Sequence, residues 1–180
     1  HPRFSYYGFR YIQVEGAVLK GQKNPHRLPV IQKIQSCFVY NSAPKVSTFQ
    51  CSNRIFNEAH RLIEKAVRSN MQSVFTDCPH REKLGWLEQD HLCGPGLLYN
   101  YDLTGFLPQT LQNIADAQHA NGAVPTTAPE YVVFEGPGMD AFAESPEWGC
   151  TFVVLPFMYY ETYGDDSLIR KYYNGMRRYI

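Results

Sequence analysis

The pattern of hydrophobic and polar positions changes near residue 50. Before that point, FRYIQVEG at 9–16 and IQKIQSCFVY at 31–40 are rich in β-branched and aromatic residues, and a segment with Gly, Lys, Asn and Pro at 21–29 separates them. Runs of this kind between turn-forming residues predict β-strands. Two or three strands are too few for a stable sheet domain, so they indicate the end of a larger β domain.

From Ser52 onward, apolar residues recur at every third or fourth position, which predicts an amphipathic helix of about four turns. Ser52 or Asn53 would cap its N-terminus. The apolar positions are Ile55, Phe56, Ala59, Leu62, Ile63, Ala66 and Val67.

The remaining helices are expected to alternate with long loops. The apolar pattern predicts them at 87–101, where Gly94-Pro95-Gly96 interrupts, from Leu107 to about Asn121, at 148–162 and at 167–179. Gly164 would separate the last two, with Asp166 or Ser167 as the cap of the final helix. Residues 123–147 form a long loop with Pro and Gly, and such loops in compact domains are usually functional or disordered. This organisation predicts an α/α toroid or part of one.

Composition narrows the classes of partner. The 180 residues suit one domain, or one domain with a piece of another, and 17 basic side chains balance 17 acidic ones. No basic run, acidic tail or membrane-length apolar stretch is present, so we expect neither a nucleic-acid nor a membrane partner. Aromatic residues make up 14%, which fits an aromatic core and also the apolar faces of sugar-binding clefts. The five widely spaced cysteines predict buried free thiols, and no cofactor or metal is expected.

The segment TDCPHREKLGWLEQD at 76–90 gathers acids around a tryptophan. Asp77 and Glu82 would lie about 140° apart on a regular helix, but a loop-to-helix transition at Pro79 would allow them to converge on one cavity. Each residue also has an ordinary interpretation. Asp77 could cap a helix that starts near Pro79, Glu82 could pair with Lys83 or Arg81 on the surface, and Trp86 could belong to the core.

If the segment is catalytic, its carboxyl groups suit proton transfer to a leaving oxygen. A glutamate against an indole face is poorly solvated and keeps its proton nearer neutral pH. Glycoside hydrolysis needs such an acid and a second carboxylate. Cys78 with His80 is only a weak thiol-hydrolase signal, because no third member or oxyanion-hole pattern accompanies them.

The later segment ESPEWG at 144–149 repeats the combination of acids and tryptophan. Glu147 and Trp148 could form a second wall of the same cleft. Alternatively, Ser145 caps a helix whose first turn favours acids.

The block DCPHREKLGW at 77–86 resembles the signature of the bacterial α-L-rhamnosidases, glycoside hydrolase family 78. Further blocks resemble the same family in the same order along nearly the whole chain. These are YYGFRYIQVEG at 6–16, STFQCSNRIFNEAH at 47–60, NGAVPTTAPEY at 121–131 and SPEWGCTFVVLPF at 145–157.

The resemblance implies a mainly α chain with N-terminal β strands. Residues 1–48 would be the C-terminal strands of a β-sandwich domain and a linker. Residues 49–180 would be the N-terminal part of an (α/α)6-barrel catalytic domain. The chain would then be a fragment of an enzyme that releases terminal α-L-rhamnose from plant-type glycans or glycosides with inversion.

The resemblance also implies roles for individual residues. Glu82 matches the general acid, Asp77 a carboxylate that holds the sugar, and Arg81 and Trp86 residues of the cleft. Glu147 and Trp148 match a block that lines the pocket.

Two departures from the family pattern bear on this assignment. Members often have an acid shortly after the tryptophan, where Gln89 stands here, so either Asp90 takes that role or the sugar contact is an amide. The family's general-base glutamate lies in later helices, beyond Ile180. We therefore expect the chain alone to be inactive and its open helix faces to self-associate.

Two rival functions stay open. The parent could be a non-catalytic carbohydrate-binding or scaffold protein on the same fold, or an enzyme for another glycan. The residues leave the aglycone, the linkage and the compartment open, and a bacterial periplasmic or extracellular parent is compatible with the resemblance.

Overall fold

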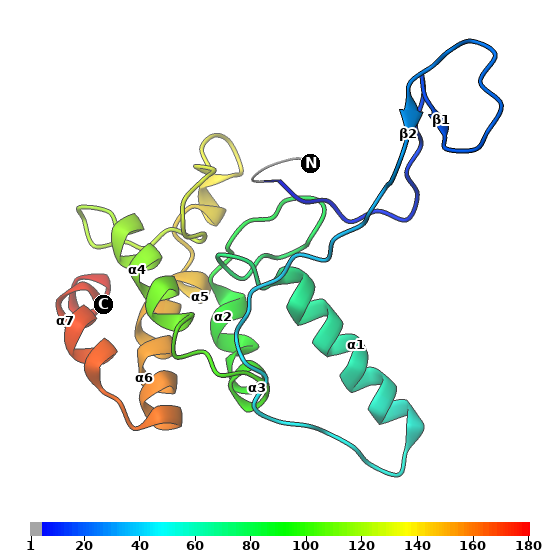
Figure 1. The fold of residues 1–180 in the computed structure, drawn as a ribbon. Helices are drawn as coiled ribbons and strands as arrows, with labels where there is room; N and C mark the ends of the chain where they lie inside the picture. Colours follow the sequence, from blue (N-terminus) through cyan, green and yellow to red (C-terminus); the bar gives the residue numbers. More distant parts are fainter. Residues whose placement is uncertain (1–4) are drawn as a thin grey trace. The chain divides into compact units, whose positions relative to one another are not determined.

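The computed structural model describes residues 5–180 (Figure 1). These residues divide into two compact units, the first ending at Val39 and the second comprising Tyr40–Ile180. Residues 1–4, the start of the segment expected to belong to the β domain, lie outside the described residues. The described chain is mainly helical and has two short strands.

The first unit contains one pair of two-residue strands. β1 (Val18–Leu19) runs parallel to β2 (Val30–Ile31), with Val18 opposite Val30. The expected strands at 9–16 and 31–40 are wrong apart from Ile31, and Ile12 and Phe38 within them are exposed. A strand needs a hydrogen-bonded partner, and within this unit the described residues provide one only at this short pairing.

The first helix of the second unit is amphipathic. α1 (Arg54–Asn70) forms as predicted, and the Asn53 side chain caps it by accepting from the Ile55 N–H at 2.9 Å. Most of its apolar face is exposed: Ile55, Phe56, Leu62 and Ile63 are all between 59% and 74% exposed. The helix contains no buried residue, and its hydrophobic stripe meets the core at Val67, near its C-terminal end.

Two short helices replace the single interrupted helix expected next. α2 (Glu88–Leu92) ends at Cys93, and α3 (Gly94–Asn100) starts directly after it. Pro95 occupies the first turn of α3, where its missing N–H costs no helical hydrogen bond. Pro95 therefore starts a helix and does not break one.

The long loop and the last helices follow the predicted order. α4 (Leu107–Ala117) ends earlier than predicted because Gln118 is extended, and the long loop contains the 3-10 turn η1 (Asp140–Phe142). It leads into α5 (Pro146–Gly149), α6 (Thr151–Tyr163) and α7 (Ser167–Tyr179).

The turn between α6 and α7 has a predicted residue, Asp166, at the N-cap position, but the capping hydrogen bond is accepted by its neighbour Asp165. Gly164 ends α6 in the left-handed conformation, φ 69°, which favours glycine. The Ser167 N–H donates to Asp165 Oδ1 at 2.8 Å, whereas Asp166 pairs with Arg170. Asp166 is therefore the N-cap residue of α7, as one of the two predictions had it, but its side chain makes no capping bond and Asp165 supplies the acceptor. The alternative cap, Ser167, is the first residue of the helix.

The core of the second unit is built around α6. Helices α2, α3, α4 and α7 all pack against α6, as Figure 1 shows for the group beside the orange helix. Phe152 and Leu155 of α6 and Leu111 and Ile114 of α4 are fully buried. Among the described residues, no helix has the length and apolar character that a membrane crossing requires.

All five cysteines are free thiols, as predicted, but none is buried. Cys37 and Cys93 are exposed, and Cys51, Cys78 and Cys150 are half-buried. The expectation of buried thiols is wrong because these residues lie in linkers and helix ends outside the core.

Candidate active site

The acid segment at 77–84 is a closed loop and not the start of a helix. The Asp77 N–H donates to the Leu84 carbonyl at 3.1 Å, and the Leu84 N–H donates back to Asp77 Oδ1 at 3.0 Å. Asp77 therefore closes the loop and caps no helix. The next helix begins only at Glu88, so the expected transition at Pro79 is wrong.

Glu82 projects from this loop with both carboxylate oxygens engaged. Arg81 Nη2 donates to Oε1 at 2.6 Å, and Trp86 Nε1 donates to Oε2 at 3.2 Å. The Glu82 side chain is 36% exposed. The indole thus contacts the carboxylate through its N–H, which corrects the expectation of a glutamate desolvated against the indole face.

Backbone pairing holds Trp86 in place. The Leu87 N–H donates to the Thr126 carbonyl and the Ala128 N–H donates to the Gly85 carbonyl, both at 3.0 Å. Trp86 and Thr127 face each other across this antiparallel pair. The pairing anchors the C-terminal end of the acid loop to the first limb of the long loop.

Four aromatic side chains from three segments meet beside Glu82, and we call them the aromatic group. The ring centroid of Trp86 lies 5.3 Å from that of Phe134 and 5.9 Å from that of Trp148, and Phe142 lies 6.4 Å from Phe134. Tilted rings at these separations attract one another. Phe142 is exposed, the other three rings are half-buried, and Trp148 also packs against the core. The group therefore lies at the edge of the core and is partly open to solvent.

Phe134 and Phe142 were missed by residue-level analysis of the sequence. The available signal was the length of the segment at 123–147, since long loops in compact domains are often functional. Nothing in the local pattern indicated which aromatic side chains in it would reach Trp86.

The second acid segment contributes Trp148 to the aromatic group, but its acid Glu147 bonds to Ser145 and not to that group. Ser145 Oγ donates to the Glu147 carboxylate, and this hydrogen bond lowers the pKa of Glu147. Ser145 therefore bonds the first-turn acid of α5, and its side chain makes no capping bond to the helix backbone. Glu147 is exposed, whereas Trp148 reaches the aromatic group.

Asp90 is set apart from these residues by burial. It lies in α2, is 4% exposed, and its Oδ1 has no hydrogen-bond partner among the described residues. Burial raises the pKa of Asp90 well above its usual range. Gln89, the other residue considered for the same role, is half-buried.

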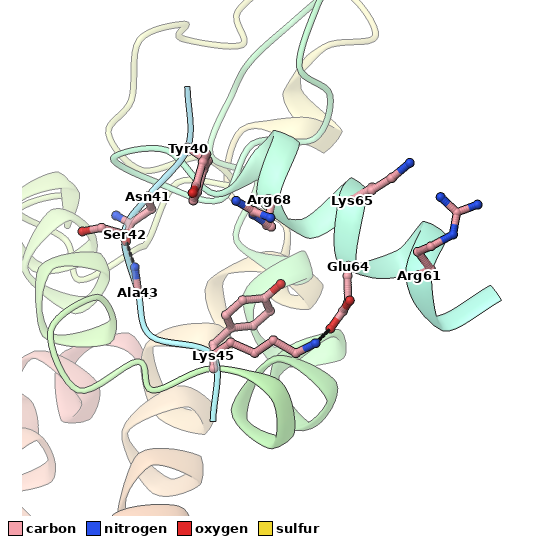
Figure 2. A pocket seen from close by; sticks show the side chains of 10 residues that line it. Tyr40, Asn41, Ser42, Ala43, Lys45, Arg61, Glu64, Lys65 and Arg68 are labelled. Carbon is pink, nitrogen blue, oxygen red and sulfur yellow. Dashed lines mark hydrogen bonds and ion pairs between the residues drawn. The ribbon is translucent and has the colours of Figure 1, made fainter. Parts of the chain in front are cut away.

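A hollow of about 590 Å³ lies between α1 and the segment at 40–45, and no residue of the acid segment or the aromatic group lines it (Figure 2). It has a cationic lining, but the cations mostly have partners within the chain. Lys45 pairs with Glu64, Arg61 with Glu58, and Arg68 lies 3.9 Å over the Tyr40 ring. We interpret this hollow as structural. Across residues 5–180, no three metal-ligating side chains come together in a possible metal site.

Comparisons with known proteins identify relatives for most of the chain. Residues 44–180 match the model of the bacterial alpha-L-rhamnosidase 6 hairpin glycosidase domain. An alpha-L-rhamnosidase of Formosa agariphila is 30% identical over 98% of the chain, and one of Streptomyces avermitilis is 31% identical over 93%. The chain spans only 18% and 15% of the lengths of these two relatives.

Solved structures give the same result for the fold. The alpha-L-rhamnosidase from Dictyoglumus thermophilum superposes on 78% of the chain, with a TM-score of 0.69 and 28% identity, and the chain covers 15% of it. The Streptomyces avermitilis enzyme complexed with L-rhamnose gives a TM-score of 0.68 over 77% of the chain at 28% identity, and the chain covers 13% of it. The described helices therefore have the fold of part of a six-hairpin glycosidase domain, as the sequence predicted.

Proposed function

The chain belongs to the family of the bacterial α-L-rhamnosidase six-hairpin glycosidase domain, and from that premise we propose that it carries the acid side of a site that hydrolyses terminal α-L-rhamnosides. The observation that supports this most directly is the geometry of Glu82. Two donors hold its carboxyl group beside the partly exposed aromatic group, within a closed loop.

In the proposed reaction, Glu82 is the general acid that protonates the departing oxygen. Trp86 and Trp148 contact the apolar C–H side of the sugar, and Arg81 orients the acid. Asp77 binds a sugar hydroxyl through Oδ2, because Oδ1 is occupied by the Leu84 N–H.

Glu147 and Asp90 complete the proposed contacts under different conditions. Glu147 is exposed and accepts a hydrogen bond directly from a sugar hydroxyl. Asp90 is buried, so it reaches the sugar only after a local rearrangement, and Gln89 is the alternative contact at this position.

We propose further that the reaction inverts the anomeric carbon and uses a base outside these residues. Inverting glycosidases hold their two carboxyl groups about 6.5–9.5 Å apart, with a water between the base and the sugar. The low share of the relatives' length that the chain covers, 18% for the first, supports a base elsewhere in the parent. The 180-residue chain by itself should therefore turn over negligible rhamnoside.

The test uses the full-length parent and two aryl α-L-rhamnosides, one with a good and one with a poor leaving group. Removing a general acid costs about 10²–10⁴-fold in rate, and the loss is largest where the leaving oxygen needs the proton most. E82Q should therefore lose about that factor on the poor leaving group and much less on the good one. The matched control E161Q, on an exposed turn of α6, should retain full activity on both substrates.

Product stereochemistry and the isolated chain complete the test. Proton NMR at early times should show the β-anomer of L-rhamnose as the first product. Retention of configuration would refute the inverting part of the proposal. Turnover by the purified 180-residue chain that E82Q abolishes would refute a base located elsewhere.

A non-catalytic sugar-binding role is favoured by one observation, the amide of Gln89 where family members often have an acid. A binder would retain L-rhamnose without hydrolysing rhamnosides. An enzyme for another glycan is distinguished by inhibition, because L-rhamnose would then inhibit no better than other monosaccharides.

A further inference from the structure

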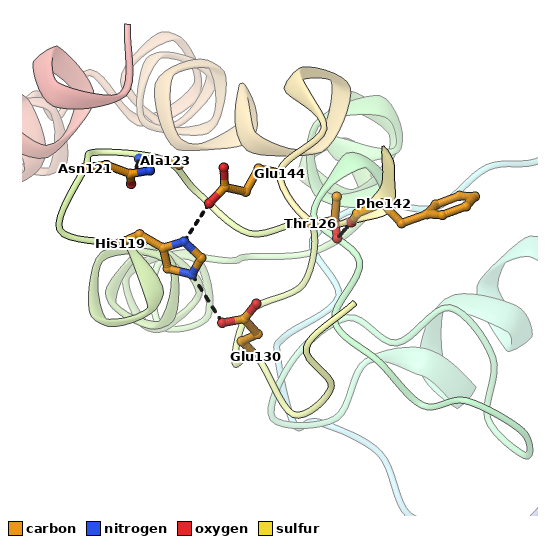
Figure 3. Close-up of polar contacts among 7 residues, drawn as sticks. All are labelled: His119, Asn121, Ala123, Thr126, Glu130, Phe142 and Glu144. Carbon is orange, nitrogen blue, oxygen red and sulfur yellow. Dashed lines mark hydrogen bonds and ion pairs between the residues drawn. The ribbon is translucent and has the colours of Figure 1, made fainter. Parts of the chain in front are cut away.

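His119 bonds to two glutamates that lie on opposite limbs of the long loop. Nδ1 lies 2.7 Å from Glu144 Oε1, and Nε2 lies 3.3 Å from Glu130 Oε2 (Figure 3). His119 stands in the turn that follows α4, where its backbone N–H donates to the Ala123 carbonyl. We call His119, Glu130 and Glu144 the clasp.

The clasp closes the loop that carries half of the aromatic group. Phe134 and Phe142 lie between Glu130 and Glu144 along the chain, and Phe134 contacts Trp86. Apart from the clasp, the limbs are joined where the Thr126 N–H and hydroxyl donate to the carbonyls of Ala143 and Phe142. The clasp is therefore a second tie on the same loop, made by side chains alone.

Protonation decides whether both bonds of the clasp exist. An imidazolium has two N–H groups and can donate to both carboxylates at once, whereas neutral imidazole has one N–H and turns a lone pair toward the other carboxylate. We infer that His119 is a positioning residue, a proton-dependent tie that holds Phe134 and Phe142 against Trp86.

The surroundings of His119 favour the charged form. The hydrogen bond to Glu144 is the largest cause that raises the pKa of His119, and Glu130 adds to it against partial desolvation. Arg178 of α7 donates a hydrogen bond to the side-chain amide oxygen of Gln118, the residue before His119. Its charge therefore faces that amide. A raised pKa means that the tie is fully present below about pH 6.5 and is lost as the pH rises through the folded value.

The consequence for the sugar site rests on the proposed function. Since Trp86 donates to Glu82, a loop that loosens around Phe134 changes the surface beside the proposed general acid. The tie itself needs no sugar chemistry, so it is tested without an activity assay.

Tryptophan fluorescence reports on this region directly, because the two tryptophans of the chain, Trp86 and Trp148, are both in the aromatic group. The 180-residue chain should show an emission change with a midpoint above about pH 6.5. H119Q should lack this change, and E144Q should shift its midpoint downward. H80Q, which alters an exposed histidine of the acid loop, should retain it.

Chymotrypsin provides a second, independent measurement. Tyr131 and Phe134 lie within the loop, and Tyr131 is exposed. Losing a charge-assisted hydrogen bond should make cleavage there about threefold to tenfold faster in H119Q than in the wild type at pH about 6. The two rates should converge at pH about 9, where the tie is open in both.

The outcomes separate the tie from the proposed function. An unchanged transition in H119Q, or equal cleavage rates at pH about 6, would overturn the tie whatever the parent hydrolyses. Loss of the transition in H119Q supports the tie even if the parent shows no rhamnosidase activity, which would then refute the proposed function alone. A transition lost in H80Q and kept in H119Q would assign it to the acid loop and overturn the tie.

Discussion

Gly85 should be the most sensitive small residue of the candidate site. A Cβ added at this position would lie 2.6 Å from the Ala128 carbonyl oxygen and 3.3 Å from Val74 Cγ2. The oxygen belongs to the backbone, and Ala128 is 3% exposed, so neither side can move freely. G85A should therefore separate the two paired segments that hold Trp86.

The expected cost follows from these contacts. Overpacking of a buried position costs about 1–3 kcal/mol. If the segments part instead, the hydrogen bonds from Leu87 N and Ala128 N are lost, at about 0.5–1.5 kcal/mol each. Both routes predict a loss of about 1–3 kcal/mol in the free energy of unfolding.

Urea unfolding followed by tryptophan emission measures this loss and also the local displacement. The control is G96A in α3, where a Cβ would meet nothing within 4 Å. That variant should gain about 0.5–1 kcal/mol, because alanine favours a helix over glycine. A G85A chain as stable as the wild type, with the same native emission spectrum, would refute the close approach of Gly85 and Ala128.

Two further predictions concern burial. Burial raises the pKa of Asp90, so the stability contributed by its protonated carboxyl group is fully present below about pH 3.9 and is lost as the pH rises through the folded pKa. D90N should therefore be about 1–3 kcal/mol more stable than the wild type at pH about 8 and equally stable near pH 4. Urea unfolding at both pH values measures the difference in free energy of unfolding between D90N and the wild type. An equal gain at both pH values would contradict the prediction, and D116N, at an exposed position, is the control. The exposed apolar face of α1 should make the 180-residue chain self-associate. The double variant L62E/I63E should therefore show a lower mass in light scattering than the wild type, and a monodisperse wild-type monomer would count against this prediction.

The local hydrophobic pattern predicted the helices well, because the apolar spacing that marks a helix lies within a single segment of the sequence. The apolar spacing from Ile55 to Val67 predicted α1, Asn53 was one of its two predicted caps, and Gly164 predicted the end of α6. The strands were predicted poorly for a matching reason. A strand depends on a partner supplied by another segment, and the runs at 9–16 and 31–40 find little partner in their own unit.

The sequence pointed to the acid segment of the candidate site, but it indicated neither the contacts of that segment nor Phe134 and Phe142. The block at 77–86 identified Glu82 and Trp86, yet the loop closure through Asp77 and Leu84 depends on a left-handed turn at Lys83, φ 57°, that no propensity indicates. Phe134 contacts Trp86, and backbone pairing at Gly85–Leu87 holds the first limb of the long loop beside that tryptophan. Contacts between segments far apart in sequence depend on packing, which periodicity does not encode.

Trp86 links these segments physically, and this has a consequence for how the proposed acid is positioned. Its N–H contacts Glu82, its backbone faces Thr127, and its ring contacts Phe134 and Trp148. The position of the Glu82 carboxylate therefore depends on the long loop and on α5, although neither contacts Glu82 through a hydrogen bond. An inverting reaction needs its acid held at a fixed distance from a base on the other side of the sugar. A tie on the long loop, such as His119, can thus change the acid's position without touching substrate, and this is why the loop, and not only the acid segment, belongs to the proposed site.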